Sequence, residues 1–201
     1  MKQISILDRI LLLATGLLAG YQIVVGLDGM EPLTIWFYTI GFGTLLVAGL
    51  LLIILGFDGL ENQAVVIVST LIPLNISLGL ISKHLAEYTL LYFVFCVVGF
   101  ISIIITRFSV TGKIATLVLA VVHGVAGLII FLLPVFLTLS GSLSAGYALV
   151  GVGGALIGLG GFLLAFLKAG KPILSQQTIL SILPALLLLM TAAFIGGFSF
   201  R

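Results

Sequence analysis

The stretch "IATLVLAVVHGVAGLIIFLLPVFLTL", Ile114–Leu139, contains no aspartate, glutamate, lysine or arginine. A helix needs about 20 apolar residues to cross the roughly 30 Å hydrocarbon core of a bilayer. This stretch is long enough to do so, and its only ionisable side chain is that of His123. It therefore predicts a transmembrane helix.

Six other stretches share this apolar character. They are Arg9–Leu27, Leu33–Gly56, Ala64–Ser82, Tyr88–Thr106, Leu143–Leu167 and Thr178–Phe198. The chain of 201 residues is 62% hydrophobic and 7% charged, whereas about 25% of the residues of a typical soluble domain are charged. So few charges cannot cover a water-facing surface, and the segments between the stretches are short. The sequence predicts an all-α fold, a single polytopic transmembrane domain over residues 1–201.

The distribution of lysine and arginine predicts the orientation of the bundle. If the N-terminus is cytoplasmic, the cytoplasmic side holds Lys2, Arg9, Arg107, Lys113, Lys168 and Lys171, and the other side holds Lys83 and Arg201. Cytoplasmic loops of membrane proteins carry the excess of positive charge. We therefore expect a multi-pass protein of the cytoplasmic (inner) membrane, with the N-terminus in the cytoplasm and the C-terminus outside.

Two similar acidic segments, "GLDGMEP" at Gly26–Pro32 and "GFDGLEN" at Gly56–Asn62, connect the first three stretches. They fall on opposite sides of the predicted membrane, so they cannot form one cation site. Each begins with a glycine, which can end a helix in a left-handed conformation. The aspartate two residues later can cap the next helix, and Glu31 or Glu61 can complete a capping box. We interpret both segments as helix boundaries.

An ionisable residue at membrane depth is a candidate functional residue, and His123 is the one candidate within the predicted spans. It shares a helix face with Thr116, Ala120 and Gly127 by spacing. The imidazole could be a gate in a permeation path, a haem ligand, or a neutral group hydrogen-bonded between helices. The second histidine, His84, lies in the loop "SKHLAEY", which argues against a bis-histidine haem.

The stretch "STLIPLNISLG", Ser69–Gly79, places a proline and several polar side chains inside the third span. Pro73 has no N–H, so the carbonyl of Ser69 loses its usual partner. Asn75 and Ser77 follow it. Broken helices with free carbonyls and amides coordinate ions or polar solutes in some transporters. The alternative is a kink whose free groups bond to neighbouring helices.

The sixth span, "GYALVGVGGALIGLGGFLLAF" at Gly146–Phe166, is rich in glycine. Gly154 and Gly158 form a GxxxG pair, and Gly151 extends the same row. Such a row lets helix backbones approach closely. Its partner could be another span, a second copy of the chain, another membrane subunit, or a flat pigment or lipid.

The first three and last three spans can be aligned as parallel repeats, with the fourth span as a linker. The alignment pairs Gly41 with Gly151 and Pro73 with Pro184. Parallel repeats occur in some transporters.

The predicted spans contain no carboxylate, no Ser-His-Asp set, no phosphate-binding loop and no metal-binding motif, so we expect neither an enzyme nor a metal site. The leading hypothesis is a small-solute transporter or channel with a path near Pro73, Asn75, Ser77, Thr116 and His123. The rival is an accessory subunit of a membrane complex that contacts pigment or lipid, and a b-type haem electron carrier is a weaker alternative. The expected partners are the bilayer and other membrane chains, and a net charge of +2 does not suggest nucleic acid.

Overall fold

The computed structural model describes residues 3–27, 29–109, 113–168, 170 and 172–200. Every regular element in these ranges is helical. The elements are α1 (Ile6–Val25), α2 (Pro32–Leu55), η1 (Gly56–Glu61), α3 (Gln63–Ser69), α4 (Leu71–His84), η2 (Ala86–Tyr88), α5 (Thr89–Ser109), α6 (Lys113–Leu139), η3 (Ala145–Tyr147), α7 (Ala148–Lys168) and α8 (Gln176–Phe198). Across the described residues, seven helical segments are long and apolar enough to cross a membrane. The predicted helical fold and the predicted number of long apolar segments are confirmed.

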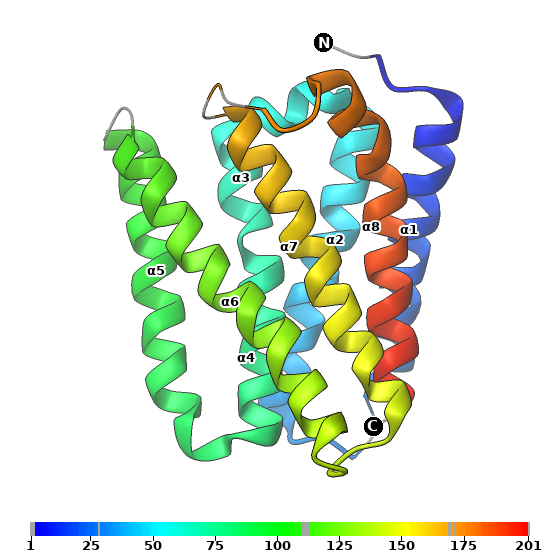
Figure 1. Cartoon of the computed structure of the whole chain (residues 1–201), viewed down its shortest axis with the longest axis vertical. Coiled ribbons are helices and arrows are strands. Elements are labelled where there is room, and N and C mark those ends of the chain that lie inside the picture. Colours follow the sequence, from blue (N-terminus) through cyan, green and yellow to red (C-terminus); the bar gives the residue numbers. More distant parts are fainter. Residues whose placement is uncertain (1–2, 28, 110–112, 169, 171, 201) are drawn as a thin grey trace.

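Six of the long segments form a ring. Its order is α1, α2, α4, α6, α7 and α8, with α8 again beside α1. The remaining long helix, α5, lies outside the ring against α3, α4 and α6 (Figure 1). We call the end at which α1 begins the upper end of the bundle, and the opposite end, at which α8 finishes, the lower end (Figure 1).

The ring consists of two groups of three helices. In each group the helices are consecutive along the chain, α1–α2–α4 and α6–α7–α8, and the groups meet at the α4–α6 and α8–α1 contacts. The proposed repeat predicts this arrangement. The proposed residue pairing is not reproduced, however, because Gly41 faces Ile76 of α4 whereas Gly151 faces Phe131 of α6.

The first helix begins earlier than the sequence predicts, because Ser5 and Asp8 form a capping box. The Ser5 hydroxyl accepts a hydrogen bond from the Asp8 N–H at 3.1 Å, and the Asp8 carboxylate accepts one from the Ser5 N–H at 2.9 Å. The two side chains satisfy N–H groups that have no partner within the helix. The helix therefore starts at Ile6 instead of Arg9.

The two acidic segments are helix boundaries, and the predicted capping box of the second segment is wrong. Gly26 and Gly56 have φ of 67° and 68° with ψ of −161° and −165°, a region that is essentially restricted to glycine and is not the left-handed helical one. The second segment forms η1, and the Asn62 side chain caps α3 by accepting from the Ala64 N–H at 2.9 Å. Glu31 precedes α2 without a side-chain capping bond, and residue 28 lies outside the described residues.

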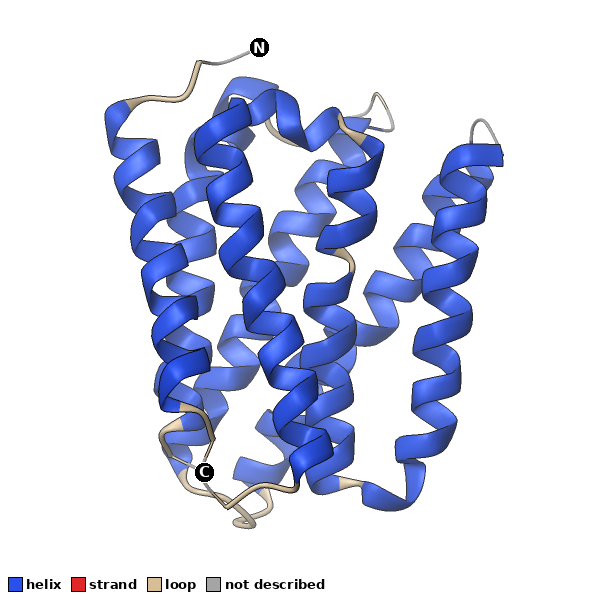
Figure 2. Cartoon of the chain, turned by 180° about the vertical axis from the view of Figure 1, so that it is seen from behind, coloured by secondary structure: helices blue, strands red, loops and turns tan. Residues whose placement is uncertain are grey.

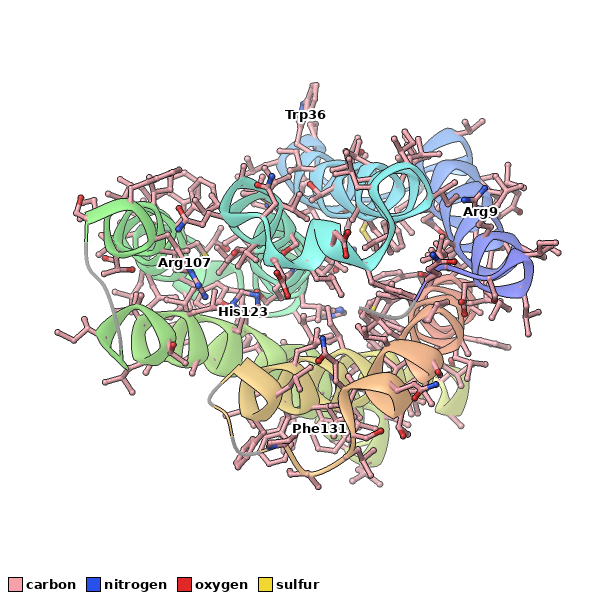
Figure 3. All side chains as sticks on the ribbon, turned by 90° about the horizontal axis from the view of Figure 1, so that it is seen from above. Arg9, Trp36, Arg107, His123 and Phe131 are labelled. Atoms are coloured by element: carbon pink, nitrogen blue, oxygen red, sulfur yellow. The ribbon has the colours of Figure 1, made fainter. Side chains whose placement is uncertain are left out.

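Aromatic rings fill the lower part of the ring interior. Phe198 contacts Tyr38, Phe42 and Tyr147 edge to face, with ring centroids 4.8, 6.2 and 6.3 Å apart. A second apolar cluster joins α4, α5 and α6 around Ile103. The outer surface is also apolar, and Trp36, which is 64% exposed, points away from the bundle (Figure 3). An apolar exterior around a packed interior suits a chain surrounded by lipid.

Candidate functional site

The predicted break in the third span lies at Thr70, between α3 and α4 (Figure 2). Helix α4 begins at Leu71, which places Pro73 in its first turn. In a first turn the missing N–H of proline removes no hydrogen bond within the helix. The hydroxyl groups of Ser69 and Thr70 both donate to the carbonyl of Val66, at 2.9 and 3.0 Å. The polar side chains at the break therefore form hydrogen bonds to the backbone of their own segment.

Asn75 lies on the side of α4 that faces α2 and α5. Its amide nitrogen donates to the carbonyl of Leu71 at 2.9 Å, and a Cβ on Gly41 would lie 3.6 Å from the Asn75 Cβ. The side chain borders a groove of about 270 Å³ between the three helices, whose other lining residues include Cys96 and Phe100. Apart from this amide and the thiol, the groove is apolar, as expected for a surface that contacts lipid chains.

Ser77 lies on a different face of α4 and is fully buried. Its hydroxyl oxygen is 2.7 Å from the carbonyl of Pro73 and 2.8 Å from the hydroxyl of Tyr92 on α5. A serine hydroxyl has one proton, and a carbonyl can only accept. Ser77 therefore donates to Pro73, and Tyr92 donates to Ser77. This link between α4 and α5 is an interhelical hydrogen bond of the kind expected near a kink.

His123 lies in the upper half of α6, and its Nδ1 is 3.2 Å from the carbonyl of Leu119. Because that carbonyl only accepts, Nδ1 carries the proton. The imidazole and the guanidinium of Arg107 on α5 point toward one another (Figure 3) and are close enough to interact electrostatically. Thr116, about two turns above His123, is exposed.

The five residues of the predicted path are not gathered at one place. Pro73 and Ser77 share one face of α4, and Asn75 lies on another, which follows from the helical spacing. His123 and Thr116 belong to α6, and no described hydrogen bond or groove connects them with Asn75. The face of α4 with Pro73 and Ser77 also carries His84, which was not among the predicted path residues.

His84 forms the contact at the lower end that sequence reasoning missed. Its Nε2 is 2.8 Å from the hydroxyl of Tyr147 in η3, and the two rings meet edge to face with centroids 5.5 Å apart. Tyr147 is fully buried. This hydrogen bond joins the last residue of α4 to the segment that leads into α7, and so connects the two groups of three helices. His84 lies at the lower end of the bundle and His123 lies in the upper half of α6, so the two histidines are at different depths.

A signal for this contact was present in the sequence. His84 follows Ser77 by seven residues, which places both on one face of a helix. The predicted span ended at Ser82, so His84 was assigned to a loop. In the structure α4 continues to His84, and the imidazole reaches the interior of the bundle.

The glycine row of α7 is partly covered by α6. A Cβ on Gly154 would lie 2.7 Å from the backbone nitrogen of Phe131, and one on Gly151 would lie 2.8 Å from its carbonyl oxygen. Gly158, one turn further up, has no neighbouring atom within 4 Å of a Cβ position. The two helices are therefore in backbone contact in their lower halves and diverge toward the upper end (Figure 1).

The described residues contain no group of three or more His, Cys, Asp or Glu side chains that could hold a metal ion. No protein-family model, curated protein or solved structure matches the chain.

Proposed function

We propose that the chain is a multi-pass protein of the cytoplasmic membrane that carries a small solute between its two groups of three helices. The observation that supports this best is the hydrogen bond between His84 and Tyr147, because it joins the two groups at the lower end. A carrier needs such a contact, one that closes the path on one side and can open when the groups move.

The packing on either side of this contact fits a closed lower end. Phe198 and Tyr147 are fully buried, and their rings belong to the aromatic layer at this end. At the upper end α6 and α7 diverge, and His123 lies on the part of α6 above their contact. The proposed path runs from the upper end past His123 toward the α4 face with Pro73 and Ser77. Asn75 borders the apolar groove between α2, α4 and α5, so we expect it to contribute less to the path than His123.

The orientation is part of the proposal. Arg9 and Arg107, together with the ends of α6 and α7 at Lys113 and Lys168, lie at the upper end, and Lys83 lies at the lower end. The excess of positive charge assigns the upper end to the cytoplasm. The closed end with His84 and Tyr147 then faces outward.

Flux into liposomes tests the function. The full chain would be reconstituted and its uptake of potassium, chloride, glycine, glycerol and glucose compared with that of protein-free liposomes. We expect uptake of at least one of these probes, a loss of that uptake in His123→Leu, and a smaller effect in Asn75→Leu. Tyr88→Phe, at an exposed tyrosine of the lower end, is the control. Uptake equal to that of protein-free liposomes for every probe, or uptake unaffected by both substitutions, would contradict the proposal.

A second candidate function, a subunit of a membrane complex, is favoured by the uncovered part of α7. Gly158 and Gly161 have no neighbours within 4 Å of a Cβ position, and Leu159 and Phe162 are 49% and 51% exposed. An exposed glycine pair among apolar residues can accept a helix of another chain. Purification in mild detergent would reveal a fixed partner, and Gly158→Leu should release it if this surface is the interface.

A further inference from the structure

Asn75 carries an amide oxygen that has no hydrogen-bond partner among the described residues. The side-chain atom that lies 2.9 Å from the Leu71 carbonyl is the amide nitrogen, because a carbonyl can only accept. The amide oxygen, Oδ1, accepts no hydrogen bond from any described residue, and protein atoms do not cover it fully. The residue as a whole is 9% exposed. Asn75 therefore presents an open acceptor in an otherwise buried side chain.

This acceptor lies far from both surfaces of the membrane in the proposed location of the chain. Asn75 is near the midpoint of the 22-residue apolar segment Gln63–His84. Water and lipid headgroups lie at the two bilayer surfaces, about 15 Å from the mid-plane, so they do not reach an acceptor at this depth. A polar group without a partner is unfavourable there. The missing donor therefore has to come from a molecule that dissolves among the lipid chains.

The groove that Asn75 borders is large enough for such a molecule. Its volume is about 270 Å³, whereas an apolar cavity of about 150 Å³ binds benzene. In proportion, the groove holds about eleven carbon atoms, which is the size of two fused aromatic rings. Ile40, Val97 and Ile101 line it and are 42%, 39% and 49% exposed. The groove therefore opens on the outer surface of the bundle, beside α5 (Figure 1), and a ligand can enter it from the lipid.

Aromatic side chains line the groove on two helices. Phe37 of α2 and Phe93 of α5 have ring centroids 6.4 Å apart and planes inclined by 35°. Phe100 of α5 lines the same groove. Aromatic rings attract one another in offset-stacked and edge-to-face arrangements beyond the effect of buried area. An aromatic ligand gains from these contacts, and a saturated lipid chain does not.

We propose that the groove between α2, α4 and α5 binds a lipid-soluble phenol whose hydroxyl group donates a hydrogen bond to Asn75 Oδ1. The aromatic body of the ligand packs against Phe37, Phe93 and Phe100. The proposal rests on the membrane location in the proposed function. It does not rest on transport, because no described hydrogen bond or groove connects Asn75 with His123.

Two matched probes, 1-naphthol and 1-methylnaphthalene, test the hydrogen bond, because they differ only by a hydroxyl in place of a methyl group. Equilibrium dialysis of the full chain in detergent, with protein-free micelles as the blank, measures the saturable binding of each probe. Asn75→Leu keeps a side chain of similar size and removes the acceptor. It should lower the ratio of the two affinities about threefold to tenfold, the effect of one hydrogen bond. The loss should fall on 1-naphthol, and 1-methylnaphthalene should bind at least as tightly as it binds the wild type.

Two adjacent valines of α5 test the position of the ligand and keep the experiment decisive if Asn75→Leu does not fold. Val97 lines the groove, whereas Val98 does not and is 57% exposed. Val97→Phe fills part of the groove and should lose the saturable binding of both probes. Val98→Phe adds the same ring outside the groove and is the matched control, which should bind both probes as the wild type does.

Three results would overturn the proposal. The first is the absence of saturable 1-naphthol binding by the wild type. The second is an unchanged affinity ratio in Asn75→Leu, which would assign the groove to lipid chains or to other molecules without a donor. The third is equal binding by Val97→Phe and Val98→Phe, which would place the ligand elsewhere. The flux assay above tests transport separately, so phenol binding without flux would contradict transport alone, and flux without phenol binding would contradict this site alone.

Discussion

The Nε2 atom of His84 lies 2.8 Å from the hydroxyl of Tyr147, and these two residues belong to different groups of three helices. Tyr147 is fully buried and His84 is half-buried, so the hydrogen bond is partly shielded from water. A bond in such a place is a specific connection between the two groups and a direct target for substitution.

Tyr147→Phe should lower the free energy of unfolding by about 0.5–1.5 kcal/mol, because it removes the hydrogen bond to the half-buried imidazole of His84. The phenyl ring keeps its packing against Phe198. Tyr88→Phe is the control, since Tyr88 is 50% exposed at the same end of the bundle. Unfolding in mixed micelles with increasing dodecyl sulfate would measure both variants. Equal effects of the two substitutions would show that the His84–Tyr147 bond adds nothing to stability.

Alanine substitutions in the glycine row of α7 should affect stability differently at Gly154 and Gly158. In Gly154→Ala the new Cβ would lie 2.7 Å from the backbone nitrogen of Phe131 and 2.8 Å from the carbonyl carbon of Ile130. Backbone atoms cannot move aside as a flexible side chain can, so we expect a loss of roughly 1–3 kcal/mol of stability from overpacking.

Gly158→Ala is the matched control for this prediction, because a Cβ at Gly158 meets open space. Alanine favours a helix over glycine by about 1 kcal/mol, so this variant should be as stable as the wild type or slightly more so. The same unfolding assay compares the two. A Gly154→Ala variant as stable as Gly158→Ala would mean that α6 and α7 are not in backbone contact.

The seven long helices could be predicted from the sequence because apolar length is a local property. Ile114–Leu139, free of the four charged residue types, matches α6 to within one residue at its start. The backbone freedom needed at Gly26 and Gly56 was also predictable, since both have positive φ. The caps were not, because whether Asn62 or a nearby aspartate reaches a free N–H depends on how the loop folds into η1.

The candidate site was harder to predict because it depends on helix rotation and neighbours. Asn75 and His123 are polar residues in apolar spans, and the sequence singles out both. It does not show that Asn75 faces a groove beside α5 while His123 faces Arg107. The importance of Tyr147 was also hidden, since its role comes from a histidine in a distant part of the chain.

Ser77 and Tyr92 offer a test of how α4 and α5 are held together. Removing either hydroxyl breaks the same 2.8 Å hydrogen bond, so the effects of Ser77→Ala and Tyr92→Phe should not add in the double variant. Hydrogen bonds between membrane helices contribute about 0.6 kcal/mol on average and about 1.7 kcal/mol at most. A coupling energy in that range, from unfolding of the four chains of a double-mutant cycle, is the expected result. Strict additivity would contradict the bond.

The orientation of the bundle can be tested with cysteines, because the chain contains only Cys96, which is buried. In a Cys96→Ala background, Gln3→Cys places a thiol near the start of α1, and Ser199→Cys places one just after α8; both positions are exposed. These positions lie at opposite ends of the bundle, and the positive charges assign the first to the cytoplasm. A membrane-impermeant maleimide added to intact cells should therefore label Ser199→Cys and leave Gln3→Cys unlabelled until the membrane is opened. Labelling of both positions from outside would place them in one compartment, which an odd number of membrane crossings does not allow. Labelling of Gln3→Cys alone would invert the bundle, and the closed end with His84 and Tyr147 would then face the cytoplasm.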